Sequence, residues 1–444
     1  MENLREKPAV SGRPVSSFTT LSSMAVVVGI VIGTGIFRLP PLVAANSSGP
    51  FQFLLFWVAG GLISMLGALC WAELSSSHPD AGGEYYFLRR AYGPAAGFFL
   101  SWGRMTVIQT GSIAVVAFIL GDFASLLLDL GPNGPAIYAA GTILVLTALN
   151  ILGTAHSRRA QNFLAALIVL ILAALSAAGL LMPAEGPGVP DATGAAGTPG
   201  GAAGLAMIFV LFTYGGWSEA AYLTGELRNV KKSILRALVA GIAVITVLYL
   251  LANLAYLRQL GFEGLRASRT AGADLAELVF GREVSLVLAA FVIFAALSTA
   301  NATILTGSRT NYALGRDFRL LGFMGKWNAR RNTPTRALLV QGAIALALVA
   351  GVRTEGGINT VVAYTAPVFW FFILLTAGAL FVFRLRGDLD PEGYRLPLFP
   401  LPPILFMAAV AYLLYSSLAY AGTGALVGVA VLLAGIPVYL LARR

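Results

Sequence analysis

Charged residues are scarce in this chain. They make up 11% of its 444 residues, whereas soluble domains carry about 25%. Hydrophobic residues reach 57%, and the mean hydropathy is +0.80. This composition excludes an ordinary soluble globule. It indicates repeated stretches of about 20 apolar residues, the length that one helical membrane crossing needs.

Cysteine and histidine are nearly absent. Cys70 is the only cysteine, so no disulfide can form within the chain. The two histidines, His78 and His156, fall in predicted loops. No metal-ligand cluster, nucleophile motif or glycine-rich phosphate loop stands out. We therefore predict no enzyme, no metal centre, no cofactor and no ATP-driven pump; a coupling ion, H⁺ or Na⁺, stays open.

Apolar runs separated by polar loops predict about twelve crossings. The net charge of +10 predicts no nucleic-acid partner, because the Lys and Arg residues gather in the loops of one side. That bias predicts a multi-pass protein of the cell's inner (cytoplasmic) membrane with both termini in the cytoplasm. Residues 261–281, in a loop on the other side, form either short helices or a plain loop. The predicted crossings are 19–45, 51–73, 94–128, 135–151, 161–182, 204–226, 234–256, 284–314, 335–352, 358–383, 402–421 and 424–441.

Two predicted crossings carry glycine clusters near their middle. The first contains Gly29, Gly33 and Gly35, and the sixth contains Gly215 and Gly216. Close helix packing is one explanation of such spacing. Paired interruptions in two halves of a chain also mark the midplane site of a transporter. An unwound helix would offer N–H groups to a carboxylate at Thr34–Ile36 and carbonyl oxygens to an ammonium group at Phe212–Gly215. An α-amino acid carries both groups.

The residues around these clusters resemble the amino acid–polyamine–organocation (APC) superfamily, specifically its bacterial amino acid permeases. The resemblance covers nearly the whole chain. It implies an all-α integral membrane fold of the leucine-transporter type, with a five-plus-five inverted repeat, broken helices 1 and 6, and two added C-terminal helices. It rests on the segments 33–37 (GTGIF), 71–74 (WAEL), 82–85 (GGEY), 212–217 (FTYGGW), 225–226 with Asn229, and Asn301 with 305–309 (LTGSR).

The same resemblance divides the chain into segments. Residues 1–18 form a cytoplasmic tail, 19–182 the first repeat, 183–203 an external linker, 204–383 the second repeat, and 402–444 the added helices with a short tail. The predicted substrate-binding residues are Gly33, Thr34, Gly35, Ile36, Phe212, Thr213, Gly215 and Trp217, with Phe212 as an aromatic gate. Further pocket candidates are Val107, Ile108 and Trp370.

Coupling is less well defined by the sequence. Some relatives carry a lysine in the fifth helix, where sodium-coupled cousins hold sodium, and Ile168 occupies that position here. Ser298 and Thr299 would line the corresponding space, or else bond back to their own helix. Glu219 is a candidate proton carrier or substrate contact, or a structural partner of Arg104. Arg38 lies just outside the first break and could steer a carboxylate, but snorkelling is the favoured interpretation. Glu73 and Glu226 lie at cytoplasmic helix ends, where we expect hydrogen bonds or ion pairs with loops.

These observations predict a secondary transporter that moves L-amino acids, with neutral ones favoured, by alternating access. The substrate carboxylate would lie on the helix 1 break and its amine on the helix 6 break. A polyamine or other organic-cation antiporter is the alternative, and a channel is a weaker one because a continuous polar pore lining is lacking. The expected partners are a small amino acid and the lipid bilayer, with no obligate protein partner evident.

Overall fold

The computed structural model describes residues 31–78, 83–153, 158–183, 200–220, 230–352, 357–391, 393–420 and 422–442. Within these ranges all regular structure is helical, apart from one isolated β-bridge between Asn328 and Thr333. Most of the predicted linker, Gly29 and Glu226 fall outside the described residues. The side chain of Glu219 does so too, although its backbone belongs to a helix.

The helices follow the predicted crossings closely, and several begin with proline in their first turn, where the missing N–H costs nothing. In the first half they are η1 (Thr34–Phe37), α2 (Pro40–Ala45), α3 (Pro50–Ser77), α4 (Glu84–Tyr92), α5 (Pro94–Gly103), the π-helix η2 (Arg104–Ile108), α6 (Gln109–Leu127), α7 (Gly134–Leu152) and α8 (Arg158–Leu181). In the second half they are α9 (Gly200–Thr213), α10 (Trp217–Ala220), α11 (Val230–Ala267), α12 (Ala271–Phe280), α13 (Arg282–Asp317), η4 (Arg319–Leu321), α14 (Thr335–Gly351), α15 (Gly357–Arg386), α16 (Leu401–Tyr420), α17 (Thr423–Leu433) and α18 (Gly435–Ala442).

Eight stretches in the described part of the chain are long and apolar enough to cross a membrane. Three shorter apolar helices, Ala166–Leu181, Ala203–Thr213 and Thr335–Gly351, coincide with further predicted crossings. This is a multi-pass membrane protein. The third and eighth predicted crossings are long, and the structure has Pro94–Leu127 and Arg282–Asp317 there. The total of twelve crossings stays a prediction, since most of the first lies outside the described residues.

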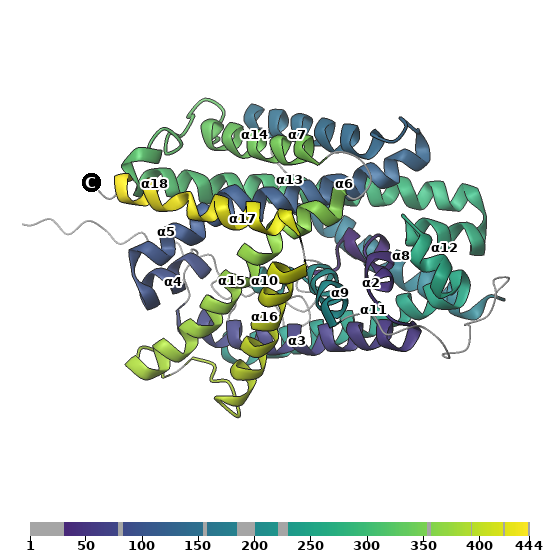
Figure 1. Ribbon diagram of the computed structural model, residues 1–444, viewed down its shortest axis with the longest axis horizontal. Coiled ribbons are helices and arrows are strands. Elements are labelled where there is room, and N and C mark those ends of the chain that lie inside the picture. The colour runs from purple at the N-terminus through teal and green to yellow at the C-terminus, as the bar shows by residue number, and fades with distance from the viewer. Residues whose placement is uncertain are drawn as a thin grey trace, which may run out of the picture.

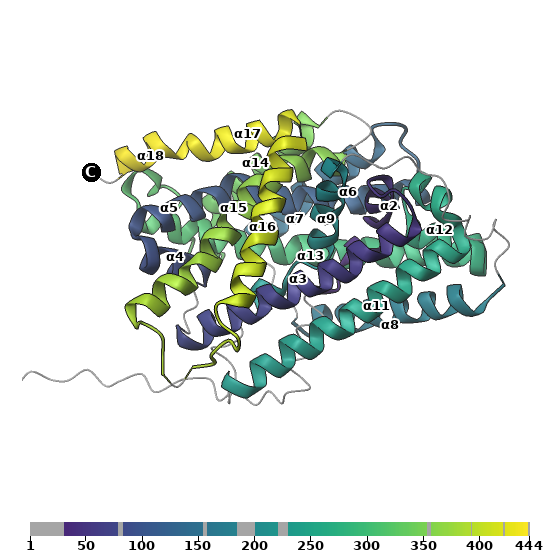
Figure 2. The ribbon, with the colours of Figure 1, turned by 60° about the horizontal axis from the view of Figure 1, so that its bottom comes forward.

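The long helices form a bundle whose two ends are easy to recognise. Figures 1 and 2 show α12 at one end, on the right, and α4, α5 and the C-terminus at the other end, on the left. We call these the α12 end and the α4 end. Near the centre α6 packs along α13, and α3 packs along α11. The α12 helix decides between the two readings of residues 261–281: this segment contains a short helix and is no plain loop.

Glycines allow α3 to approach its neighbours closely. A Cβ atom added at Gly60 would lie 2.3 Å from Val210 Cγ1, and one at Gly67 would lie 2.6 Å from Trp217 Cη2. Either distance is far below van der Waals contact. These glycines hold α3 directly against α9 and α10, so the second glycine-rich break is supported by a tightly packed neighbour.

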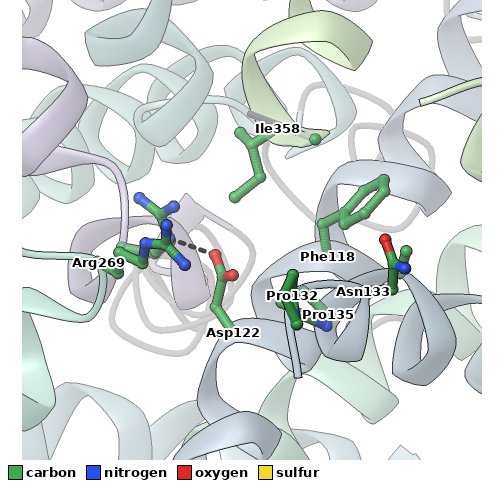
Figure 3. Close-up of a pocket in the computed structure, with 10 residues that line it drawn as sticks. Phe118, Asp122, Pro132, Asn133, Pro135, Arg269 and Ile358 are labelled. Carbon is green, nitrogen blue, oxygen red and sulfur yellow. Dashed lines mark hydrogen bonds and ion pairs between the residues drawn. The ribbon is translucent and has the colours of Figure 1, made fainter. Parts of the chain in front are cut away.

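Two charged side chains near helix ends have defined partners. The Glu73 carboxylate, fully buried on α3, accepts two hydrogen bonds of 2.9 Å from the Arg384 guanidinium and one of 2.9 Å from the Leu396 N–H. The prediction that Glu73 binds a loop is confirmed. The prediction that Arg38 snorkels is wrong: its side chain is 11% exposed and forms an ion pair with Asp122 on α6. The Asp122 carboxylate, 84 residues away in sequence, gives the guanidinium a partner inside the bundle, and Figure 3 shows this carboxylate with the ion pair as a dashed line.

Candidate functional site: a cavity between two helix breaks

The first predicted crossing is interrupted where its glycines occur. Val31 is the last described helical residue before the break, Ile32 and Gly33 lie outside any helix, and η1 then begins at Thr34. Gly33 has extended backbone angles (φ −108°, ψ −168°). Because the first N–H groups of a helix have no acceptor in their own element, those of Thr34 and Gly35 face outward from the start of η1.

The sixth predicted crossing is interrupted in the same way. The α9 helix ends at Thr213, Tyr214–Gly216 form a turn, and α10 begins at Trp217. Gly216 has φ +103°, which side chains other than glycine rarely adopt. The Phe212 carbonyl accepts the Gly215 N–H at 3.2 Å. A carbonyl oxygen has two lone pairs, so Phe212 can accept one more hydrogen bond.

One tyrosine hydroxyl links the two breaks. Tyr249 of α11 is fully buried, and its Oη lies 3.3 Å from the Val31 carbonyl oxygen and 3.1 Å from that of Thr213. Tyr256, seven residues further along α11, donates to the Ile36 carbonyl at 3.2 Å. These hydroxyls supply donors to carbonyl groups that the broken helices leave unpaired, which a membrane interior requires, and the single hydrogen of Tyr249 is shared between its two acceptors. Two tyrosines one heptad apart in an apolar helix are the sequence signal for such a role, although the sequence analysis did not predict it.

A cavity of about 260 Å³ lies between the two breaks. Gly33, Thr34 and Gly35 line it from the first break, and Phe212, Thr213 and Gly215 from the second. Of the other predicted residues, Ile108 and Thr299 also line it. The structure therefore brings six of the eight predicted substrate-binding residues to one cavity. The cavity is thus bordered both by the start of η1, with its unpaired N–H groups, and by the carbonyl oxygens at the end of α9, which suits a ligand with one anionic and one cationic group.

Ile36 and Trp217 are the two predicted substrate-binding residues that do not line this cavity. Ile36 is fully buried in the core. Trp217 packs edge-on against Trp71 and Phe406, with ring centroids 5.2 Å and 5.9 Å away, and so anchors α10 to α3 and α16. Each neighbours a lining residue in sequence, but its side chain leaves the backbone in a different direction.

Several further candidates also lie elsewhere. Ile168 of α8 is 3% exposed and belongs to the hydrophobic core. Val107 and Trp370 are also buried, and neither lines the cavity. Ser298 does not line it either, whereas Thr299 does while donating to the Ala295 carbonyl at 3.0 Å. Thr299 thus combines the two readings that the sequence left open for it.

Sequence reasoning missed the polar groups on the α4 side of the cavity. Arg104, on η2, lies 3.4 Å from both Glu84 Oε2 and Gln109 Oε1. Gln109, the first residue of α6, in turn donates to the Thr303 carbonyl at 2.9 Å and so links α6 to α13. All four residues line the cavity. Glu84 is one partner of Arg104 among the described side chains. The predicted pairing of Arg104 with Glu219 stays a prediction, because the Glu219 side chain lies outside the described residues.

Aromatic side chains form another part of the cavity wall. Phe212 lines the cavity together with Phe369 and Phe372 of α15, and the Phe212 and Phe369 ring centroids are 6.2 Å apart. The cavity thus has a mostly apolar body with a few polar groups at defined positions, the usual character of a small-molecule site. In the described part of the chain, no three His, Cys, Asp or Glu side chains gather as metal ligands.

Comparison with known proteins decides the family. A model of the family described as "Amino acid permease" matches residues 18–441. The chain belongs to the amino acid permease family. This confirms the resemblance to the APC superfamily, which is a family of transporters.

Named relatives of this permease are amino acid transporters. The b(0,+)-type amino acid transporter 1 of Mus musculus is 32% identical over 89% of this chain and 81% of its own length. The same transporter of Homo sapiens is 31% identical over 83% and 76%. Large neutral amino acids transporter small subunit 2 of Homo sapiens is 28% identical over 95% and 79%. Together with the family match, they support amino acid transport as the role of this permease.

Proposed function

We propose that this permease is a secondary transporter of neutral L-amino acids that works by alternating access. The α-carboxylate would accept hydrogen bonds from the N–H groups of Thr34 and Gly35. The α-ammonium group would donate hydrogen bonds to the carbonyls of Phe212 and Thr213. The observation that carries the proposal is the single cavity lined by both breaks. Gly33 and Gly215 let a ligand approach the backbone there, and Phe212 acts as the aromatic gate.

The preference for neutral substrates follows from the charge of the cavity. Among the lining residues whose side chains the structure describes, Glu84 and Arg104 are the ionisable ones, and they lie together as an ion pair. A charged substrate side chain would lose its water shell against the apolar walls around Phe369 and Ile373. It would find no unpaired opposite charge among the described lining residues, so its desolvation would not be compensated. The same feature disfavours a polyamine, which carries several positive charges.

Alternating access requires that one face be closed while the other is open. The cavity reaches from the breaks toward α4, since Glu84 of α4 lines it. Toward the α12 end, Phe37 is fully buried against Gly272, where an added Cβ would lie 2.6 Å from the Phe37 ring. The distribution of Lys and Arg favours a cytoplasmic α4 end, with both termini there. We therefore propose that this is an inward-facing state in the inner membrane.

The proposed architecture is two inverted five-helix repeats over 19–182 and 204–383, with two added helices. The lysine-based coupling of some relatives is not transferred, because Ile168 is apolar and buried. Thr299 lies on the cavity wall, while Ser298 and Glu219 remain candidates for an ion or proton path. The coupling ion itself, H⁺, Na⁺ or none, is decided by experiment.

One expectation needs revision. We expected no obligate protein partner, yet a relative that matches 95% of this chain is described as a small subunit. A second chain is therefore a competing proposal for this permease. Transport by the purified chain alone in liposomes would exclude an obligate partner, whereas activity that appears only in native membranes would favour one.

The test is uptake by purified protein in liposomes. We expect saturable uptake of one or more radiolabelled neutral L-amino acids, and little uptake of putrescine. Imposed Na⁺, proton or counter-substrate gradients would then identify the coupling. Conductance at channel rates, or no uptake and no binding across an amino acid panel, would contradict the proposal.

A further inference from the structure

A wide turn interrupts the long helical stretch Pro94–Leu127 beside the cavity between the two breaks, the central cavity. Between α5 and α6, residues Arg104–Ile108 form the π-helix η2, and the Gln109 N–H donates to the Arg104 carbonyl five residues earlier. A single π turn places one extra residue in a helix and often occurs at functional sites. The residues that line the central cavity show what this extra residue does.

The π turn brings side chains from both of its sides to the cavity. Leu100 and Gln109 both line it, although Gln109 follows Leu100 by nine positions. In a regular α-helix, with about 3.6 residues per turn, side chains nine positions apart point about 180° away from each other. Side chains five positions apart point about 140° away from each other, yet Arg104 Nη2 lies 3.4 Å from Gln109 Oε1. The π turn therefore gives α5 and α6 a common face on the cavity.

Glycines allow α15 to approach η2 closely. A Cβ atom added at Gly103, just before η2, would lie 2.9 Å from Phe372 Cε2. One added at Gly111, in the first turn of α6, would lie 2.1 Å from Thr365 Oγ1. Both neighbours belong to α15, so a side chain of α15 can reach the backbone of η2 between these two glycines.

One side chain of α15 bonds directly to the wide turn. Tyr364 is buried, and its hydroxyl donates to the carbonyl of Thr106, the middle residue of η2, at 2.8 Å. The Thr110 hydroxyl of α6 donates to the same carbonyl at 3.0 Å. A π turn changes the pairing of backbone groups, and inside a membrane the carbonyls affected need donors from side chains. The Tyr364 hydroxyl supplies such a donor at the centre of η2.

We propose that Tyr364 is a positioning residue for substrate binding: its hydrogen bond to Thr106 keeps η2 in the π form and so keeps Gln109 at the central cavity. The inference rests on the proposed transport function. Tyr364 does not line the cavity itself, so it acts through the backbone of η2. Without its hydroxyl, η2 relaxes toward α-helical geometry. That change turns Gln109 away from Arg104 and Thr303 and alters the shape of the binding space.

The test is a double-mutant cycle on substrate exchange in liposomes. Tyr364→Phe removes only the hydroxyl and should raise the KM for a neutral amino acid about fivefold, while kcat stays within about twofold. Gln109→Ala should raise the KM by a similar factor. Because both changes remove the same arrangement, the double variant should have the KM of Gln109→Ala and not the product of the two effects.

Tyr92→Phe is the matched control. The Tyr92 hydroxyl also donates to a carbonyl of α15, that of Leu375 at 3.0 Å, but Tyr92 is 41% exposed and does not line the cavity. This variant should keep the wild-type KM. An unchanged KM in folded Tyr364→Phe protein would overturn the positioning role. Fully additive effects in the cycle would overturn it too, because they would show that the hydroxyl acts independently of Gln109.

Failure of the proposed function looks different. A wild-type protein that exchanges no amino acid would refute transport, and the positioning role with it. Normal exchange by the wild type, together with an unchanged KM in Tyr364→Phe protein, would refute the positioning role alone.

Discussion

At the scale of single residues, the two glycines near η1 differ in what surrounds them. A Cβ atom at Gly33 would meet no atom within 4 Å, although Gly33 lines the central cavity. One at Gly35 would lie 3.3 Å from Leu39 Cδ1 and 3.6 Å from the Thr213 backbone. Gly33 thus borders the cavity between the breaks, and Gly35 lets the two broken helices come into contact.

Gly33→Ala should therefore impair binding without impairing folding. Its backbone angles are open to alanine, and the new methyl group enters the space proposed for the substrate. We expect the Kd for substrate to rise about five- to tenfold while the free energy of unfolding changes by less than about 0.5 kcal/mol. Gly141→Ala is the control, because Gly141 on α7 also has no neighbour within 4 Å and is exposed. Equal affinity of the two variants would speak against the assigned site.

A second residue-scale prediction concerns His78, just beyond the end of α3. Burial lowers the pKa of its imidazole from the ordinary value of 6.5, and the positive charge of Arg90 lowers this pKa further. Between the folded and unfolded pKa values the unfolded chain binds more protons, so the protein should lose stability as the pH falls below about 6.5. Thermal unfolding in detergent at several pH values measures this loss.

The control for this prediction is His78→Gln. Because His156 remains in both proteins, any difference in slope belongs to His78. The variant should lose less stability between pH 7 and pH 5 than the wild type does. Identical slopes would show that His78 titrates as it does in the unfolded chain.

At the scale of elements, the Tyr249 hydroxyl connects the two breaks through its contacts with the Val31 and Thr213 carbonyls. Tyr249→Phe leaves the carbonyls of Val31 and Thr213 without this donor, at a cost of about 1–2 kcal/mol. We expect the melting temperature to fall and exchange to slow, because both half-helices lose their common support. Tyr138→Phe removes a hydroxyl that donates to the Leu128 carbonyl at an exposed position, and it should leave exchange unaffected. If the Tyr249→Phe protein exchanged amino acids at the wild-type rate, transport would not depend on this hydroxyl, contrary to the prediction.

The positions of the helices and of both breaks could be predicted from the sequence. Long apolar runs require a helix in a membrane, and glycine clusters are the local signal that interrupts one. The direction of single side chains could not be predicted. Trp217 and Ile36 each lie beside a cavity residue in sequence, but the turn of the backbone sends them into the core. Arg38 meets Asp122, 84 residues away, and no local pattern encodes such a contact.

At the scale of the whole molecule, the cavity between the breaks extends toward the α4 end, where the ion pair of Arg104 and Glu84 lines it. A substrate that crosses the bundle would pass the breaks and then this ion pair. On the other side of the breaks, the contact between Phe37 and Gly272 closes the route toward the α12 end. Opening that closure while the α4 side closes is the rigid-body change that alternating access demands.

The central claim is that amino acids cross this permease at the contact between its two broken helices. Amino acid exchange by Gly35→Leu and Gly141→Leu proteins in liposomes tests it most directly, since both exchange a mid-crossing glycine for the same side chain. Gly35→Leu fills the contact between η1 and Thr213, whereas Gly141→Leu adds a side chain to an exposed face of α7. We predict that Gly35→Leu is folded but inactive and that Gly141→Leu exchanges like the wild type. Undiminished exchange by folded Gly35→Leu protein would contradict the account.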